Sequence, residues 1–400
     1  MPTPLILTEG GPAQTVALTG AEYRALNDLG IATVTPTLDD GHFDIVAARK
    51  VGAVTVGNHQ IIVRPKITNL NRVLFMLGYA RNPQIWRDEP IRVEAADELL
   101  PAVAEAFSRI ASHAVEQGLL QGYRTITDAL PVLRGRVLAG EQMSRRYGLP
   151  VPIAVQYDDF TVDIAENQLL AMATLRLLTV PRISDPARRS LQRLRRTLGE
   201  VSVPPPGTPT PRWHPSRLNV RYHAALRLAE IILAAESFEH RIGNVTVTGY
   251  MFDMWKIFED FVTTALSESL NRLGWRCQPQ APLYLDEQRR VGMQPDLLCR
   301  YDDSRVAVVD AKYKAERPEG FPNADLYQML AYCTVLSLPE GHLIYAKGNE
   351  KGRVHTVQRS GVTIHCRALD LGLDPAALLR QVDQLAVRIA KTGALADRKE

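Results

Sequence analysis

One short run in the last third of the chain constrains the fold more than any other feature. Residues 306–312 read Val-Ala-Val-Val-Asp-Ala-Lys, the pattern of a buried β-strand interrupted by one acid and one base. Because side chains alternate along a strand, Asp310, Lys312 and Lys314 are expected on one face. The spacing therefore places a carboxylate and an ammonium group side by side.

A second acid, Asp296, precedes this strand. Directly opposed residues of an antiparallel hairpin share a face, so Asp296 joins Asp310 only in one set of registers. Pairing these two residues also pairs Tyr301 with Arg305 and leaves residues 302–304 as a short polar loop. The hairpin therefore brings both carboxylates and the lysine together without forcing the geometry.

This group of side chains suits phosphodiester hydrolysis, which needs a hard cation to stabilise the scissile phosphate and to activate water. Asp296, Asp310 and the backbone carbonyl of Ala311 are the predicted ligands of Mg²⁺, with Mn²⁺ as a substitute. Lys312 is predicted to orient or deprotonate the attacking water. The alternative is that an Asp-x-Lys sequence at a strand end forms only a salt bridge.

A helix predicted over residues 249–270 supplies a third carboxylate. Its Glu259 falls at helical spacing from Val262 and Leu266, so the carboxylate points along the apolar stripe. A buried glutamate is rare unless it is paired or binds a metal. Glu259 is predicted either as an additional metal ligand or water-holding residue, or as a structural residue behind the ligands.

The helix predicted over residues 323–338 is apolar nearly all round, but Gln328 and Tyr332 fall on one face. Two polar groups on a buried helix need partners, which either an adjacent active site or hydrogen bonding within the core would provide. We expect Gln328 to belong to the catalytic group. Tyr332, Lys314 and Lys347 are expected to contact nucleic acid.

The rest of the chain divides into segments by pattern. Residues 1–90 read as a small β-rich domain, with strands between residues 43 and 64 and a helix over residues 69–79. Residues 91–240 read as mainly helical, interrupted by a proline-rich connector over residues 203–215. These patterns predict two domains ahead of the catalytic residues.

The last segment, residues 241–400, alternates helices and strands, which predicts an α+β or α/β domain with a mixed sheet flanked by helices. Only 9 of the 47 cationic residues in the chain are lysines, so a lysine is less often expected by chance at a motif position. The net charge of +3 permits contact with nucleic acid without arguing for it.

Composition excludes several classes of protein. The 46% hydrophobic and 23% charged residues are ordinary for a globular protein. No apolar run reaches the ~18 residues of a membrane span, and no signal-peptide pattern is present, so we expect a cytoplasmic protein without a membrane partner. The four cysteines are far apart with no Cys-x-x-Cys pair, so we expect buried free thiols rather than zinc, iron–sulfur or disulfide sites.

Together these motifs resemble the McrC family, the nuclease subunits of McrBC modification-dependent restriction systems, which have the PD-(D/E)xK, restriction-endonuclease-like fold. The resemblance covers most of the chain, with the first 40 residues and the proline-rich connector least similar. The segments that carry it lie, in this order, at residues 63–67, 74–80, 132–136, 163–167, 255–259, 294–296, 309–313 and 327–332.

The resemblance implies a partner as well as an activity. McrC proteins work with McrB, a GTP-hydrolysing AAA+ ring that recognises methylated cytosine and translocates DNA. The resemblance therefore implies that this chain docks on a McrB-like GTPase or ATPase ring through residues 1–90, stimulates nucleotide hydrolysis by the ring and cuts DNA. The chain itself has no Gly-x-x-x-x-Gly-Lys-Ser/Thr motif, so it is not expected to hydrolyse nucleotide by a P-loop.

Two other functions fit the same residues. One is a self-sufficient repair or restriction nuclease whose N-terminal 240 residues bind DNA directly. The other is a nuclease-like adaptor that activates the motor and does not cut.

Overall fold

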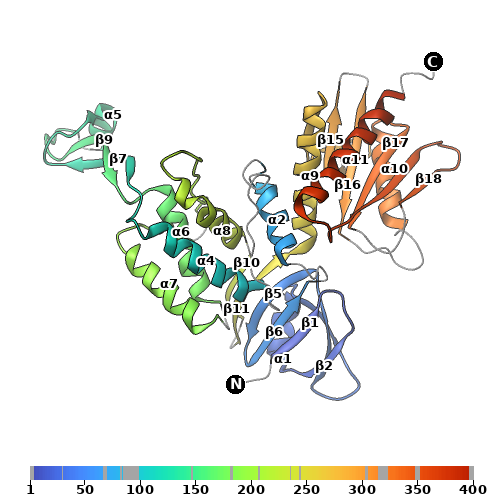
Figure 1. The fold of residues 1–400 in the computed structure, drawn as a ribbon, viewed down its shortest axis with the longest axis horizontal. Helices are drawn as coiled ribbons and strands as arrows, with labels where there is room; N and C mark the ends of the chain where they lie inside the picture. Colours follow the sequence, from blue (N-terminus) through green and yellow to red (C-terminus); the bar gives the residue numbers. More distant parts are fainter. Residues whose placement is uncertain are drawn as a thin grey trace. The chain divides into compact units, whose positions relative to one another are not determined.

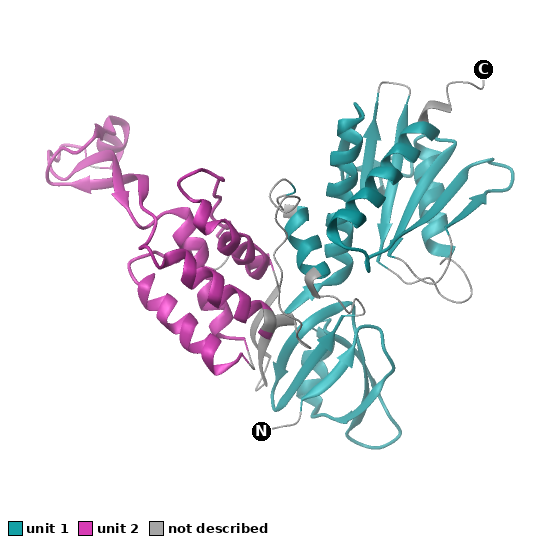
Figure 2. Ribbon diagram, in the orientation of Figure 1, with its two compact units in different colours: residues 1–99, 236–400 teal, residues 100–235 magenta. Residues whose placement is uncertain are grey.

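The computed structural model describes residues 4–395, apart from residues 29, 66–69, 82, 84–98, 146, 181–182, 206–207, 235, 243–244, 302–304, 314–322 and 347–351. The chain forms two compact units, residues 1–99 with 236–400 and residues 100–235 (Figure 2). Both units contain helices and strands, which confirms the predicted mixed α/β class. The units differ from the three predicted segments because the chain returns to the first unit at residue 236.

The N-terminal part of the first unit is built on two small sheets. Their strand orders are β1-β6-β5-β11-β10 and β2-β4-β3. The predicted hairpin of β5 and β6 and the predicted helix α2 are confirmed within a few residues. The elements are β1 (Leu5–Thr8), β2 (Gln14–Ala17), α1 (Gly20–Asp28), β3 (Ala32–Pro36), β4 (His42–Ala47), β5 (Lys50–Val56), β6 (His59–Arg64) and α2 (Leu70–Arg81).

Two strands from much later in the chain complete the five-stranded sheet. Residues 247–253 of β11 pair antiparallel with the whole of β5, and β10 forms the edge. The helix predicted over residues 249–270 therefore begins only at Met254, because pairing with β5 overrides the helical pattern of the residues before it. The boundary expected at residue 240 falls inside β10. β10 spans Glu236–Ile242 and β11 spans Val245–Asp253.

Helix α9 (Met254–Arg272) follows β11 directly and packs on α2. The buried rings of Phe75 and Tyr79 lie with their centroids 5.9 and 5.7 Å from that of Phe261. The Tyr79 hydroxyl also donates a hydrogen bond to Glu268 Oε2, at 2.5 Å. These contacts join the N-terminal sheets to the C-terminal part of the unit.

The C-terminal part is a six-stranded mixed sheet of order β12-β15-β16-β17-β19-β18 (Figure 1). β16, β17 and β19 run parallel, whereas β12, β15 and β18 pair antiparallel to their neighbours. Its elements are β12 (Arg276–Pro279), β15 (Leu297–Arg300), β16 (Val306–Lys312), α10 (Asn323–Val335), β17 (Glu340–Ala346), β18 (Arg353–Thr356), β19 (Thr363–Leu369) and α11 (Pro375–Leu395), with a small hairpin of β13 (Leu283–Tyr284) and β14 (Gly292–Met293) beside it.

Helices cover both faces of this sheet. Lys312 bonds to Gln328 of α10, whereas the ring of the next residue, Tyr313, lies tilted against that of Phe258 of α9 at a centroid distance of 5.9 Å. Because neighbouring residues of a strand point to opposite faces, α10 and α9 lie on opposite sides of the sheet. Helix α11 packs against α9 and therefore shares its side (Figure 1).

The expectation of four free thiols is wrong for two of the cysteines. Cys277 of β12 and Cys299 of β15 are directly opposed in the sheet and form a disulfide with their Cα atoms 4.0 Å apart. Cys333 and Cys366 are buried thiols that belong to no disulfide, as predicted. The sequence spacing concealed the pair because the pairing of β12 with β15 is set by the tertiary fold.

The second unit combines a helical bundle with a small sheet of order β7-β9-β8. The longer helices were predicted, but the short helix over residues 139–145 and the strands were not. Few of the strand side chains are buried, so the strands give little alternation of apolar and polar residues. The elements are α4 (Leu99–Val115), β7 (Gly122–Leu130), β8 (Arg136–Val137), α5 (Ala139–Arg145), β9 (Ile153–Thr161), α6 (Ala165–Leu178), α7 (Asp185–Thr197), the 3-10 helix η1 (Val220–Tyr222) and α8 (His223–Ala234).

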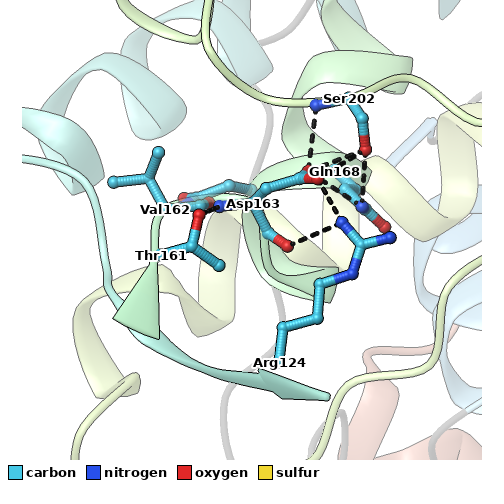
Figure 3. A network of polar contacts seen from close by, with 7 residues as sticks. Arg124, Thr161, Val162, Asp163, Gln168 and Ser202 are labelled. Carbon is cyan, nitrogen blue, oxygen red and sulfur yellow. Dashed lines mark hydrogen bonds and ion pairs between the residues drawn. The ribbon is translucent and has the colours of Figure 1, made fainter. Parts of the chain in front are cut away.

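The Asp163 carboxylate joins this small sheet to the bundle (Figure 3). It pairs with Arg124 of β7 and accepts hydrogen bonds from Gln168 of α6, at 2.9 Å, and from the backbone and hydroxyl of Ser202. Burial alone would raise the pKa of Asp163, but these hydrogen bonds and the arginine charge lower it. Asp163 is therefore ionised and ties three separate segments together.

No helix in the described part of the chain combines the length and the apolar character needed to cross a bilayer.

Candidate active site

The hairpin of β15 and β16 has the predicted register. Leu297 lies opposite Val309, and Tyr301 donates its backbone hydrogen bond to Arg305 at 3.0 Å. The polar loop predicted at residues 302–304 lies outside the described residues. This register places Asp296, just before β15, next to the end of β16 that contains the acid and the base.

Asp310 and Lys312 form an ion pair on the face of the sheet that α10 covers. Lys312 Nζ lies 2.5 Å from Asp310 Oδ2, and Asp310 is only 1% exposed. Burial raises the pKa of Asp310, although the lysine opposes this shift. Burial alone would lower the pKa of Lys312, but the Asp310 charge raises it, so Lys312 remains an ammonium group.

Asp296 approaches from the neighbouring strand. Its Oδ2 accepts a hydrogen bond of 2.6 Å from the backbone amide of Ala311, between the two residues of the ion pair. Burial and the charges of Asp310 and Glu259 raise the pKa of Asp296 to about 8, against the opposing effect of the Ala311 amide. Asp296 is therefore mostly protonated at neutral pH in the absence of a cation.

Glu259 belongs to the same group of acids. It is 9% exposed on α9, and burial raises its pKa, while a hydrogen bond with Asp296 opposes the shift. Its Oε1 accepts a hydrogen bond of 3.2 Å from the side-chain amide of Gln280. The structure thus brings Glu259 to Asp296 from helix α9, which packs on one face of the sheet.

Gln328 and Tyr332 of α10 bond to each other and to their surroundings. The Gln328 oxygen accepts from Lys312 Nζ at 3.0 Å, and its amide donates to the Tyr332 hydroxyl at 2.8 Å. That hydroxyl donates to the backbone carbonyl of Gln294, at 3.0 Å. Tyr332 is 1% exposed and presents no surface to a nucleic acid. The predicted contacts Lys314 and Lys347 lie outside the described residues.

Three polar residues near the site were not predicted from the sequence. Gln280 and Gln294 bond to each other, the Gln294 amide donating to the Gln280 carbonyl at 2.8 Å. Asp325 is buried in the first turn of α10, where it accepts a hydrogen bond from the Tyr345 hydroxyl at 3.2 Å. The only sequence signal that could have pointed to these residues was a polar side chain next to an identified motif, such as Gln294 two residues before Asp296.

The donor atoms suit a hard cation bound mainly by water. Within the part of the chain that the structure describes, no three histidine, cysteine or acidic side chains converge into a complete metal cage. Mg²⁺ normally takes only one or two carboxylates and keeps several waters, so Asp296, Asp310 and the carbonyl of Ala311 fit it. The raised pKa values show an excess of buried acid that such a cation would relieve.

A mixed sheet flanked by helices, with two carboxylates and an ion-paired lysine on one hairpin, defines a protein with an acidic, cation-compatible centre. The chain belongs to the family of McrBC 5-methylcytosine restriction system components, whose model matches residues 45–346. A search of the curated proteins found no significant match.

Two solved structures resemble the chain. A chain from a half-complex of the tetradecameric assembly of Thermococcus gammatolerans McrB AAA+ hexamers with bound McrC is 17% identical, with a TM-score of 0.57. The match covers 98% of this chain and 100% of the other, so the two share a fold. A chain of the Thermococcus gammatolerans McrBC complex is 19% identical over 67% of this chain and 88% of the other, with a TM-score of 0.38.

Proposed function

We propose that this chain is the DNA endonuclease subunit of a McrBC-like, modification-dependent restriction system, with a PD-(D/E)xK catalytic domain. The observation that carries the proposal is the buried ion pair of Asp310 and Lys312 beside Asp296 on one hairpin. An ordinary surface salt bridge explains neither the burial nor the second and third carboxylates. Membership of the restriction family supports the same activity.

A bound Mg²⁺ or Mn²⁺ ion would stabilise charge on the scissile phosphate and lower the pKa of a bound water. Asp296, Asp310 and the Ala311 carbonyl would hold the ion. Glu259 would hold a water of its hydration shell. Lys312, kept as an ammonium group by Asp310 and aligned by Gln328, would orient the attacking water and the phosphate rather than remove a proton.

The proposed partner is an AAA+ GTPase or ATPase ring of the McrB type. The structure that shares this fold over 98% of the chain comes from an assembly of McrB hexamers with bound McrC. We propose that such a ring recognises and delivers DNA, and that this chain stimulates its nucleotide hydrolysis. The absence of a P-loop motif from the sequence supports this division of labour.

The docking surface was predicted in residues 1–90, but among the described residues the second unit exposes more large apolar side chains. The small sheet and its loops expose large apolar side chains, including a Tyr123–Phe160 ring pair with centroids 5.2 Å apart. Clusters of this kind mark surfaces that a protein partner covers. The exposed residues of this cluster are Tyr123, Val132, Leu133, Val137, Met143, Tyr147, Leu149, Val151 and Phe160.

The test uses the full chain with its cognate ring, Mg²⁺, nucleotide and methylated DNA. Asp310→Asn is expected to lower cleavage by at least about a thousandfold while leaving nucleotide hydrolysis by the ring intact. Asp383→Asn, which removes an acid from a surface ion pair with Arg272, is the matched control. Unchanged cleavage with Asp310→Asn contradicts the proposed centre and favours the non-catalytic activator, with the cut made by another component of the assay.

The same assay distinguishes the proposed two-component system from a self-sufficient nuclease. Robust Mg²⁺-dependent cutting of unmodified DNA by the purified chain, without any ring protein or nucleotide, contradicts the two-component proposal.

A further inference from the structure

We infer that Gln280 is a positioning residue of the candidate active site, holding the Glu259 carboxylate toward Asp296. The inference rests on the proposed metal-dependent function and deepens it. Gln280 was not among the residues predicted from the sequence. Three observations carry the inference: its place in the sheet, its hydrogen bonds and its backbone conformation.

Gln280 directly follows the last residue of β12, where the ladder with β15 ends. Pro279 is paired with Leu297, so the next pair in the register is Gln280 with Asp296. The Gln280 backbone amide donates a hydrogen bond of 3.1 Å to the Asp296 carbonyl. The ladder therefore fixes the position of Gln280 relative to one of the proposed metal ligands.

The Gln280 side chain makes the second contact with the site. Its amide nitrogen lies 3.2 Å from Glu259 Oε1 and donates to it. Glu259 also shares a hydrogen bond with Asp296, so its carboxylate is held between these two residues. A carboxylate that is held on one side by an amide keeps a fixed orientation when its other partner binds a cation.

The polar contacts continue from Gln280 across the site. The Gln280 carbonyl accepts from the Gln294 amide at 2.8 Å, and the Gln294 carbonyl accepts from Tyr332 at 3.0 Å. Tyr332 in turn accepts from Gln328, which accepts from Lys312. Gln280 therefore links the Glu259 carboxylate to a series of hydrogen-bonded residues that reaches the lysine of the ion pair.

The backbone conformation of Gln280 supports a role for its side chain. Its φ is +47°, a conformation shared by only three other non-glycine residues in the described part of the chain. Glycine adopts this conformation without steric cost, whereas a side chain is disfavoured there. A glutamine at such a position is explained by the contact that its amide makes with Glu259.

This conformation also provides a clean experiment. Gln280→Gly relieves the backbone and removes the whole side chain with its amide, and because Gln280 is exposed the substitution leaves the core intact. Ser337→Gly is the matched control, because Ser337 is exposed, has a φ of +54° and donates its backbone hydrogen bond to Thr334, which is not a site residue. Both variants are made in the full chain, and Mn²⁺ binding is measured by calorimetry without DNA.

Gln280→Gly is expected to weaken Mn²⁺ binding roughly tenfold, at the low end for residues that orient metal ligands, without lowering the melting temperature. Ser337→Gly is expected to bind Mn²⁺ like the unmodified chain. Unchanged affinity in Gln280→Gly overturns the inference, and so does an equal loss in Ser337→Gly.

A further pair of measurements separates this inference from the proposed function. If Asp310→Asn binds Mn²⁺ as tightly as the unmodified chain, the proposed metal centre fails whatever Gln280 does. A crystal structure of metal-free Gln280→Gly then decides the positioning role by itself. A Glu259 carboxylate turned away from Asp296 supports that role, and an unmoved carboxylate overturns it.

Discussion

The hydroxyl of Tyr313 donates a hydrogen bond of 3.1 Å to Glu9, a residue 304 positions earlier in the chain. Tyr313 directly follows Lys312, and Glu9 directly follows β1 of the N-terminal sheet. Glu9 is 2% exposed, so this bond lies inside the first unit. The N-terminal sheet therefore supports the strand that holds the proposed catalytic lysine.

Tyr313→Phe tests this support. The substitution removes one donor from a buried carboxylate, which is expected to lower the free energy of unfolding by about 1–3 kcal/mol. Thermal and denaturant unfolding of the full chain measure the change. Tyr301→Phe, at an exposed tyrosine of the same hairpin, is expected to change stability little. Equal stability of the two variants contradicts a structural role for the Glu9 contact.

Metal binding should depend on pH through Asp296. The pKa of this residue is raised to about 8 by burial and by Asp310 and Glu259, so the metal-free carboxyl is mostly protonated at neutral pH. A cation must displace that proton. Calorimetry should therefore show Mn²⁺ affinity rising between pH 6 and about 8, with proton release that depends on the buffer. A flat profile over this interval contradicts the assignment.

The same shift affects the stability of the metal-free chain. The folded-state pKa of Asp296 lies above the ordinary value of 3.8, so the unfolded chain binds fewer protons between these two values. The contribution of Asp296 to the free energy of unfolding is therefore fully present at low pH and is lost as pH rises toward about 8. Asp296→Asn is therefore expected to stabilise the metal-free protein at pH 8 by about 1 kcal/mol or more, measured by thermal unfolding. Lower stability of this variant at pH 8 would disprove the assignment.

His342 predicts a loss of stability in acid. It is 1% exposed on β17, stacks on His365 at 5.2 Å, and burial lowers its pKa to about 3. Since the unfolded-state pKa is higher, the contribution of His342 to stability is fully present above pH ~6.5 and is lost as pH drops toward 3. The free energy of unfolding should fall over this range with a slope of up to about 1.4 kcal/mol per pH unit. His342→Gln should flatten this part of the stability profile.

Exposed His113 supplies the control for that measurement, because its side chain is 84% exposed. His113→Gln is expected to leave the slope unchanged. A profile for His342→Gln that parallels the unmodified chain between pH 6.5 and 4 contradicts the role given to His342.

The proposed docking surface on the second unit can be tested without touching the active site. Tyr123 is 78% and Phe160 57% exposed, so Tyr123→Ser with Phe160→Ser should not disturb the core. The double variant is expected to weaken binding to the ring, and stimulation of nucleotide hydrolysis, by about tenfold or more. Val387→Ser, at an exposed apolar residue of α11, is the control. Normal stimulation by the double variant would place the docking surface elsewhere.

The local parts of the candidate site followed from sequence alone. The alternation along residues 306–312 predicted that Asp310 and Lys312 share a face, and parity fixed the register that places Asp296 beside them. Helical spacing placed Glu259 on a buried stripe, and it placed Gln328 and Tyr332 in contact. These inferences succeeded because they depend on periods of two and 3.6 residues within one element or one hairpin.

Only the tertiary structure decided what depends on distant pairing. β10 and β11 join a sheet with β5, Cys277 meets Cys299, and Gln280 reaches Glu259, all across separations that no local period encodes. The exposed small sheet of the second unit was missed for a related reason, because strands without a buried face lack the alternating pattern. Sequence determined the acid and base group, whereas long-range packing determined how its members are held.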